Sequence, residues 1–246
     1  MIFSALKGSA KRPLRGVRNV LRHRPYSGSG RFCPICRKNS SRFGDAGSPP
    51  RLDTRCMYCG SAERHRFTWW YLENKTDLFD GRAKRVLHVA PELHIGNHLK
   101  KRLGSGYLSA DLMNPRAMVK MDITNIQYPD DSFDVIYCSH VLEHVIDDRR
   151  AMREFRRVMR PDGWALLLVP ITVEKTFEDP SVTEPAERLR VFGQEDHVRC
   201  YGPDYFDRLE ESGFRVQAIR AEDLLAKEEL ELMRIESGET IHLCRK

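Results

Sequence analysis

The chain has 246 residues, of which 41% are hydrophobic and 31% charged, a composition typical of a soluble globular protein. Its length fits one full α/β domain with a small accessory module. No apolar run approaches the roughly 18 residues of a membrane-spanning helix, and the N-terminus lacks the apolar stretch of a secretory signal. We therefore expect no transmembrane segment and a cytoplasmic location.

The net charge of +6 is unevenly distributed along the chain. Residues 1–44 hold 11 Lys and Arg and no acid, so the rest of the chain carries 30 bases against 35 acids. We interpret residues 1–31, which are rich in Gly, Ser and Arg, as a basic flexible leader. Such an arm favours weak contact with a nucleic acid or a membrane surface. A solvated leader without a partner explains the same composition.

Four of the seven cysteines form two Cys-x-x-Cys pairs, Cys33 with Cys36 and Cys56 with Cys59. In a chain without a secretory signal, this spacing predicts metal binding rather than disulfides. A two-residue gap lets both thiolates of one turn reach a single ion, and four cysteines fill a tetrahedral site without an open position. Residues 32–61 are therefore predicted to be a zinc-ribbon module with a structural zinc ion.

A helix is expected from Ala62 to about Leu72, burying Phe67, Trp70 and Tyr71, and residues 62–83 form a linker. Within it, Arg64, His65 and Arg66 are candidates to contact a substrate or a nucleic acid, and a solvated position or a contact with the neighbouring domain explains them equally well. From residue 84 to residue 246, short apolar strands alternate with amphipathic helices. The first candidate strands are Arg85–Ala90, Tyr107–Asp111, Phe133–Cys138 and Trp164–Pro170. This alternation predicts a doubly wound, mostly parallel α/β sheet.

The second half of this region shows clear helix signals. Asp147 is placed to cap a helix whose apolar face includes Ala151 and Phe155, and the turn residues Arg160–Gly163 end that helix. The later elements expected are a helix near Asp204–Ser212, a strand near Phe214–Ile219, an acidic helix near Ala221–Met233 and a strand near Thr240–Cys244.

Ligands of an open parallel sheet bind outside the carboxyl ends of its strands. Asp111 follows the end of the first strand by about the 20 residues expected of an acid that binds ribose hydroxyls. The first loop, Val89–Gly96, has no G-x-G-x-x-G pattern, which a dinucleotide needs to bring backbone N–H groups onto its pyrophosphate. The residues therefore favour S-adenosylmethionine, which has no phosphate, over NAD.

Residues 84–170 resemble the class I S-adenosylmethionine-dependent methyltransferases, especially the group related to the ubiquinone and menaquinone pathway enzymes. The stretches that carry the resemblance are VLHVAPE, LSADL, VKMDITNIQYPDDSFDVIYCSHVLEHV and MREFRRVMRPDGWALLLVPI. The resemblance implies a seven-stranded Rossmann-like sheet with one antiparallel strand at the end. It also implies that Asp111 holds the ribose, that Asp122 and Ile123 contact the adenine, and that Ser139 and His140 lie beside the methionine part of the cofactor.

The chain departs from the family in its first strand and loop. His88 stands where the family has an acid, and Ala90, Pro91 and Glu92 replace the glycine loop. Glu92 is a candidate to bind the cofactor's ammonium group in place of the missing acid. A non-catalytic protein on this fold is an alternative.

Two further segments carry chemistry-bearing residues. The stretch from His140 to His144 matches H-x-x-E-H, the inverted zinc-peptidase pattern, but it follows a buried strand directly, which favours a packing role for His144. Residues 170–203 form a long polar connection at the carboxyl end of the sheet, where loops act as lids. Within it, His197 is the preferred general base, with His140 as the substitute, and Arg199 is placed to bind an acidic group of the acceptor.

We therefore expect a methyltransferase that moves a methyl group to a small or glycan-like hydroxylated acceptor. One alternative is an RNA methyltransferase that uses the zinc ribbon and the basic arm to bind phosphates. The other is a zinc-ribbon RNA-binding protein without catalytic activity. Cofactor binding distinguishes the two methyltransferase hypotheses from the non-catalytic one. Salt-dependent affinity for RNA distinguishes the RNA methyltransferase from the enzyme with a small or glycan-like acceptor.

Overall fold

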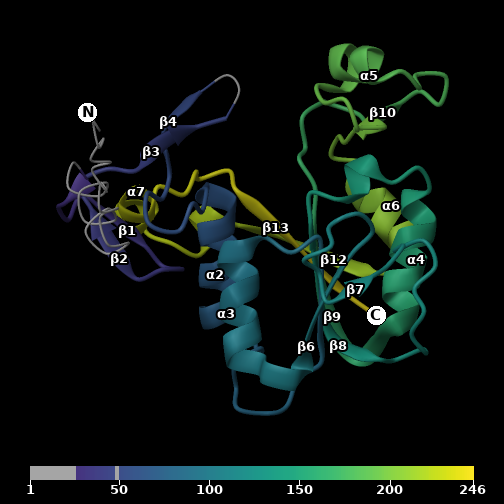
Figure 1. Cartoon of the computed structure of the whole chain (residues 1–246), viewed down its shortest axis with the longest axis horizontal. Coiled ribbons are helices and arrows are strands. Elements are labelled where there is room, and N and C mark those ends of the chain that lie inside the picture. The colour runs from purple at the N-terminus through teal and green to yellow at the C-terminus, as the bar shows by residue number, and fades with distance from the viewer. Residues whose placement is uncertain (1–25, 48–49) are drawn as a thin grey trace, which may run out of the picture.

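The computed structural model describes residues 26–47 and 50–246 (Figure 1). Most of the expected basic leader, together with its expected contact with an anionic partner, lies outside the described residues. Within the described part of the chain, no helix combines the length and the apolar character that crossing a bilayer requires.

The centre of the molecule is a seven-stranded sheet with the order β12-β13-β9-β8-β5-β6-β7. Its strands are β5 (Val86–Val89), β6 (Tyr107–Asp111), β7 (Val119–Lys120), β8 (Phe133–Ser139), β9 (Met159–Leu168), β12 (Arg215–Arg220) and β13 (Thr240–Arg245). The pairs from β7 to β9 are all parallel, and β13 alone runs antiparallel, pairing with both β9 and β12. The predicted fold class is confirmed, with the antiparallel strand last in the chain and second from the edge of the sheet.

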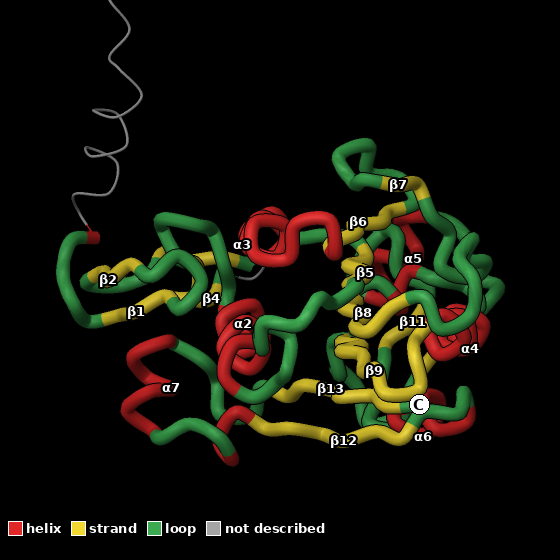
Figure 2. The backbone as a smooth tube through the Cα atoms, turned by 90° about the horizontal axis from the view of Figure 1, so that it is seen from below, coloured by secondary structure: helices red, strands yellow, loops and turns green. Residues whose placement is uncertain are grey.

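Alternation along the strands divides the core into two layers, because successive side chains of a strand point to opposite faces. Val86 and Leu166 belong to the cluster on one face, and their neighbours Leu87 and Leu167 belong to the other. Figure 2 shows the sheet between its two sets of helices. The first face is covered by α2 (Glu63–Asn74) and α3 (Leu93–Leu103), and the second by α4 (Asp148–Val158) and α6 (Tyr205–Glu211).

The helix predicted after Asp147 is confirmed, together with its cap. The Asp147 carboxylate accepts a hydrogen bond of 2.9 Å from the backbone N–H of Arg150, and this satisfies one of the free donors at the helix start. Ala151 and Phe155 are completely buried on the inner face, as expected. This helix fixes the chain that leaves the carboxyl end of β8.

Three expectations about local structure are wrong. The segment Arg160–Gly163 is not a turn, because the chain passes from α4 straight into β9, which starts with an irregular register against β8. The acidic segment near Ala221–Met233 is not one helix: a 3₁₀ turn, η4 (Ala221–Asp223), precedes α7 (Lys227–Met233). In α2 it is Trp69 that is fully buried, and Trp70 is only partly covered.

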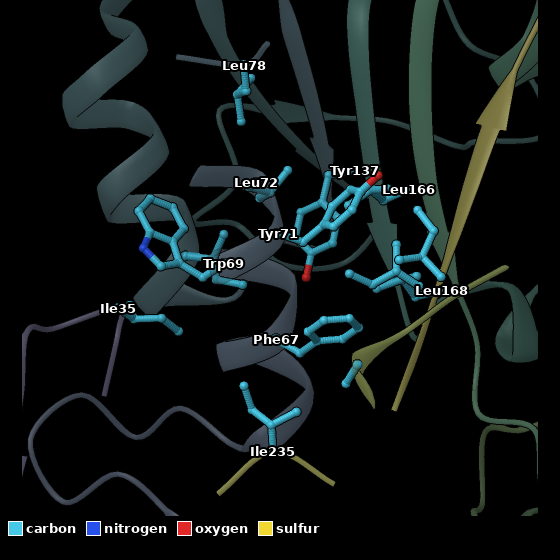
Figure 3. Packing of buried hydrophobic residues seen from close by; sticks show 14 of the residues in the cluster. Ile35, Phe67, Trp69, Tyr71, Leu72, Leu78, Tyr137, Leu166, Leu168 and Ile235 are labelled. Carbon is cyan, nitrogen blue, oxygen red and sulfur yellow. The ribbon is translucent and has the colours of Figure 1, made fainter. Parts of the chain in front are cut away.

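The cysteine-rich unit consists of two short hairpins that pack against α2. The hairpins pair β1 (Arg31–Cys33) with β2 (Lys38–Ser40) and β3 (Gly44–Ala46) with β4 (Arg51–Arg55). Figure 3 shows the side chains of α2 between this unit and the sheet: Trp69 lies on the same side of α2 as Ile35, and Tyr71 points toward Tyr137 and Leu166. The unit and the sheet therefore share one hydrophobic cluster.

The buried guanidinium of Arg66 connects three parts of the chain through backbone carbonyls. It donates hydrogen bonds to Thr54 and Ser61 at 2.8 and 2.9 Å, and to Met233 and Arg234 at 2.5 and 2.9 Å. The sequence left four roles open for Arg66: contact with a substrate, a nucleic acid or the neighbouring domain, or a solvated position. The structure shows an interdomain role, because Arg66 holds α2, the cysteine-rich unit and the end of α7 together.

The polar connection of residues 170–203 rises above the carboxyl ends of the strands (Figure 1). It contains β10 (Phe177–Glu178), which pairs with β11 (Arg199–Cys200), and α5 (Pro185–Phe192). Its end is fixed to the loop after β8 by the backbone hydrogen bond from Val198 N–H to Glu143 O, 2.9 Å. It is therefore in place to cover a ligand at this edge of the sheet.

Candidate functional site

The chain turns sharply after two neighbouring strands, β5 and β8. Ala90 has a φ of 47° and His140 a φ of 55°, values that side chains with a Cβ rarely adopt. Each turn is held by a backbone bond to the next strand, from Ala90 N–H to Ala110 O at 2.8 Å and from His140 N–H to Leu168 O at 2.9 Å. Chain order reverses between β5 and β8, and ligand sites of doubly wound sheets lie at such reversal points.

A cavity of about 710 Å³ lies in front of these turns. Its lining includes five of the eight residues predicted to bind the cofactor, namely Ala90, Asp111, Asp122, Ile123 and His140. Pro91, Glu92 and Ser139 do not line it. Large apolar side chains that the protein leaves exposed also border the cavity, including Met113 and Ile146 at 83% and 81% exposure. Exposed apolar groups beside a hollow are typical of a surface that binds an aromatic ring.

Of the four acids that line the cavity, Asp111 and Asp122 each have one oxygen fixed and one oxygen open. Oδ1 of Asp111 accepts hydrogen bonds of 2.8 Å from the backbone N–H groups of Met113 and Asn114. Oδ1 of Asp122 accepts bonds of 2.8 Å from the N–H and hydroxyl groups of Thr124. Among the described residues, nothing hydrogen-bonds to the second oxygen of either carboxylate. Both side chains are therefore oriented while keeping an acceptor for a ligand hydroxyl or amine.

Glu92 belongs to a buried network behind the first turn. Its carboxylate lies 2.8 Å from Nε2 of His88 and accepts a 3.2 Å hydrogen bond from the hydroxyl of Tyr137. Burial alone raises the pKa of Glu92, but the hydrogen bond from His88 and the charges of His88 and His65 lower it to about 2. The other ring nitrogen of His88 lies 3.0 Å from the hydroxyl of Tyr107. The acid therefore remains ionised and is held inside the protein.

Arg199 holds the loop after β8. It is 3% exposed, and its guanidinium donates to the carbonyls of Leu142 (2.9 Å), Val145 and Ile146 (2.8 Å) and to Glu178 (2.8 Å). Four of its five N–H groups are thus used by the protein itself. The expected binding of an acidic acceptor group is replaced by a structural role: Arg199 fixes the loop that carries His140 and His144.

His197 is buried beneath the same loop and lines none of the cavities described here. It is 7% exposed, and its ring meets the ring of His144 edge-on at 4.6 Å between centroids. Burial and the charge of His144 lower the pKa of His197, which keeps its imidazole neutral. The ligand atoms of Glu143, His144 and His197 lie within 4.8 Å of one another. The sequence indicated Glu143 and His144 in one motif and His197 in another segment, but not that the three meet.

A second cavity, of about 410 Å³, lies on the other side of His140. Its polar lining comes from the first turn of α2, β4 and the segment before β13, with Glu63, Arg64, Arg51 and Glu239 among the residues. Glu63 is 3% exposed, forms an ion pair with Arg51, and has no hydrogen bond to either oxygen among the described residues. Sequence reasoning missed Glu63 and Glu239, because neither lies in a motif.

The four cysteines of the two pairs converge in the cysteine-rich unit. Sγ of Cys33 lies 3.6 Å from that of Cys59, Sγ of Cys36 lies 3.7 Å from that of Cys56, and all four sulfurs are within 4.8 Å of one another. Four sulfurs bound to zinc at about 2.3 Å would be about 3.8 Å apart, so the arrangement fits a tetrahedral ion. Hydrogen bonds from the other three thiols hold the pKa of Cys33 well below its usual value.

Each cysteine pair is shaped by the same backbone turn. The N–H of Arg37 donates to Cys33 O at 2.9 Å, and the N–H of Gly60 donates to Cys56 O at 2.8 Å. Both donor residues have positive φ, 57° and 83°. The side chain of Ser61 lies 3.3 Å from the sulfur of Cys33 and accepts a 3.2 Å bond from Cys59. Two equivalent turns thus present four thiols to one point.

Comparison with known proteins identifies the central part of the chain. Residues 97–167, from α3 to β9, match the family model of a methyltransferase domain. Over 75 residues the chain is 37% identical to an uncharacterized methyltransferase of Bacillus subtilis, which covers 30% of this chain and 28% of that protein. Over 130 residues it is 27% identical to the demethylmenaquinone methyltransferase of Mycolicibacterium paratuberculosis, covering 45% of this chain and 56% of the relative.

The chain therefore spans between about a quarter and about half of the length of these curated relatives. Among solved structures, it is similar to a proposed sarcosine dimethylglycine methyltransferase from Galdieria sulphuraria, with a TM-score of 0.50 and 17% identity over 75% of this chain and 86% of the other. At 17% sequence identity, this similarity shows a shared fold and nothing about substrate or activity. Taken together, the matches show that the chain carries a methyltransferase domain on a Rossmann-like sheet.

Proposed function

We propose that the protein transfers a methyl group from S-adenosylmethionine to a small hydroxylated acceptor. The observation that supports this most directly is the pair of half-open carboxylates, Asp111 and Asp122, in a cavity at the reversal point of a methyltransferase-type sheet. When bound, the cofactor supplies an electrophilic methyl group on a positively charged sulfur.

The residues of the cavity fit this cofactor. The open oxygen of Asp111 is an acceptor for ribose hydroxyls, and the open oxygen of Asp122 is an acceptor for the adenine amine. Met113 and Ile123 offer apolar contact to the adenine ring. The absence of a glycine-rich loop matters little here, because no phosphate has to approach the backbone. Glu92, tied to His88, acts on the cofactor only by keeping the first turn in shape.

His140 is the residue best placed to act on the acceptor. It lines both the cofactor cavity and the second cavity, so a nucleophile bound in the second reaches the methyl group past this side chain. Its Nδ1 lies 3.4 Å from Oε1 of Glu143, which orients the ring. We therefore assign the general base to His140 in place of His197, which is buried and lines neither cavity.

The polar lining of the second cavity favours a small hydroxylated acceptor. Glu63, Arg64 and Glu239 offer acceptors and donors for several hydroxyl groups, and a volume of about 410 Å³ suits a small molecule or one sugar unit. In the cysteine-rich unit, we propose that Cys33, Cys36, Cys56 and Cys59 hold one structural zinc ion. That ion has no open position and would stabilise the hairpins that carry Arg51 to the second cavity.

Calorimetry with S-adenosylmethionine and its demethylated product tests the cofactor site. The Asp111→Ala variant removes a hydrogen bond between a carboxylate and ribose, so we expect a loss of about 1.5–3 kcal/mol, or roughly ten-fold to over a hundred-fold in affinity. Asp207→Ala, on the outer side of α6, is the matched control. Absence of binding by the wild type, or equal binding by Asp111→Ala, would contradict the site.

Labelled cofactor then identifies the acceptor. Transfer of labelled methyl groups to metabolites or glycans supports the proposal, while transfer to RNA with salt-dependent affinity supports the RNA alternative instead. Cofactor binding without transfer to any of these classes would favour the non-catalytic reading.

A further inference from the structure

Three metal-ligating side chains meet beside the cofactor cavity. The ligand atoms of Glu143, His144 and His197 lie within 4.8 Å of one another. Nitrogen and oxygen ligands sit about 2.0–2.2 Å from a divalent ion, so two ligands of one ion are at most about 4.4 Å apart. Side-chain shifts of a few tenths of an ångström would therefore bring all three onto one ion. The backbone bond between Val198 and Glu143 holds the two contributing segments together.

The carboxylate of Glu143 indicates that this cluster binds a ligand. Glu143 is 1% exposed, and its Oε2 has no hydrogen-bond partner among the described residues. Its Oε1 has one neighbour, Nδ1 of His140 at 3.4 Å. A buried carboxylate with an unpaired oxygen is unfavourable unless a positive charge or a donor compensates it. A cation next to His144 and His197 would supply that charge.

We propose that Glu143, His144 and His197 bind a divalent transition-metal ion, separate from the four-cysteine site. Two imidazoles and one carboxylate suit zinc, manganese and similar ions, and three protein ligands leave positions open for an exogenous ligand. His144 lines the cofactor cavity, as does Asp196, whose Oδ2 lies 3.2 Å from His144 Nδ1. The proposed site therefore borders the cavity through His144.

Hydrogen bonds from neighbouring residues hold the loop that carries Glu143 and His144, as the outer contacts of a metal site hold its ligands. Arg199 binds the carbonyls on both sides of the Glu143–His144 pair, and the hydroxyl of Tyr201 donates to the carbonyl of Leu142 at 3.3 Å. These bonds fix the loop from below. Such outer contacts set the orientation of metal ligands and commonly change metal affinity by about 10- to 100-fold when removed.

The chemical role of the ion rests on the proposed function and narrows the acceptor to a molecule that binds metal through oxygen. A hydroxyl bound to the ion loses its proton to His140, which lies beside Glu143. The oxygen then forms the bond to the methyl carbon while the carbon–sulfur bond breaks. The electron pair of that bond remains on sulfur, which becomes a neutral thioether, and the methylated acceptor leaves the ion.

Titration with Mn²⁺ tests the site without any acceptor. The protein is dialysed against a weak chelator, so that exchangeable ions leave while thiolate-bound zinc stays, and free Mn²⁺ is then counted by electron paramagnetic resonance. Manganese prefers nitrogen and oxygen ligands and does not compete for thiolates. We expect one bound Mn²⁺ per wild-type chain. Glu143→Gln and His144→Gln should each weaken binding at least ten-fold.

The variants are chosen so that folding and binding can be separated. His144 is 30% exposed at its side chain, so its replacement should leave the thermal midpoint nearly unchanged. His98→Gln is the matched control, because His98 packs against Trp69 on the opposite face of the sheet and should bind Mn²⁺ as the wild type does. Wild-type binding weaker than about 1 mM, or affinities within three-fold of wild type in both ligand variants, overturns the proposal.

Calorimetry on the same samples distinguishes this proposal from the proposed function. Mn²⁺ binding without binding of S-adenosylmethionine would leave the metal site standing and contradict the methyltransferase. Cofactor binding without Mn²⁺ binding would contradict the metal site alone.

Discussion

Nε2 of His88 lies 2.8 Å from Oε2 of Glu92, across the turn that follows β5. The related family has an acid in this strand, and here a histidine occupies the strand while the acid stands four residues later. The two side chains are joined, and the hydroxyl of Tyr137 donates to the same carboxylate. With His88 in the strand and Glu92 in the turn, a negative charge remains at the end of β5, and a network of side chains takes the place of the glycine loop.

Replacing Glu92 should affect stability more than cofactor binding. Glu92→Gln removes the charge that pairs with His88, so we expect the free energy of unfolding to fall by about 1.5–3 kcal/mol. Affinity for S-adenosylmethionine should change less than three-fold, because Glu92 does not line the cavity. Urea unfolding and calorimetry measure the two effects, with Glu210→Gln, at an exposed position of α6, as control. A ten-fold loss of affinity at unchanged stability would instead place Glu92 at the ammonium group.

The cysteine site should hold one zinc ion per chain. Cys33→Ser should remove one equivalent relative to the wild type and destabilise the hairpins, because a structural ion contributes directly to folding. Cobalt replacement provides a specific check: charge-transfer absorption from thiolates should appear in the wild type and vanish in the variant. Zinc content that is the same in a variant with all four cysteines changed to serine contradicts the assignment.

Removing Arg199 should loosen the loop after β8. Arg199→Ala leaves the carbonyls of Val145 and Ile146 without a donor among the described residues, and it removes one of the two arginines that pair with the carboxylate of Glu178. Loss of one partner from a buried charged network costs about 3–5 kcal/mol, so urea unfolding should show a large decrease in stability. Arg149→Ala, which breaks an exposed pair with Glu211, should cost less than about 1 kcal/mol. Equal effects in the two variants would contradict the structural role of Arg199.

Glu239 should make stability depend on pH. Burial and the charges of Glu63 and Glu236 raise its pKa to about 7, although nearby Arg64 and Arg51 oppose this. A carboxyl whose pKa is raised on folding binds more protons in the folded than in the unfolded chain, so stability falls as pH rises from about 4.5 to about 7.

The Glu239→Gln variant mimics the neutral carboxyl. Its free energy of unfolding should match that of the wild type near pH 5 and exceed it by roughly 2 kcal/mol near pH 8. Urea unfolding at several pH values measures the difference. A difference between variant and wild type that stays constant across this range would show that Glu239 does not titrate there.

The sequence predicted the parts of the fold that depend on local pattern. Tyr107–Asp111 is a strand with the same bounds as expected, and Asp147 caps its helix, because apolar runs and caps act over a few residues. The segment Arg160–Gly163, predicted as a turn, lies in β9. Pairing of β9 with β8 overrides the local preference of these residues for a turn. The two-residue strand β7 has too short a pattern to be seen.

The candidate site was predicted only in part for the same reason. Asp111, Asp122 and His140 follow strand ends, and strand ends of a parallel sheet converge by topology. Arg199 was assigned to an acceptor because its partners are backbone carbonyls more than 50 positions earlier, and the sequence carries no mark of them. The meeting of Glu143 and His144 with His197 depends on how the connection of residues 170–203 folds back, which periodicity does not specify.

The four hydrogen bonds of Arg66 have a consequence for the order of assembly during synthesis. Two of the acceptors, Thr54 and Ser61, are made before the arginine, but Met233 and Arg234 are made more than 160 residues later. The cysteine hairpins can close around an ion while the sheet is still incomplete. The guanidinium of Arg66 makes its full set of hydrogen bonds only after α7 has been translated, so the early module becomes anchored to the rest of the chain late in synthesis.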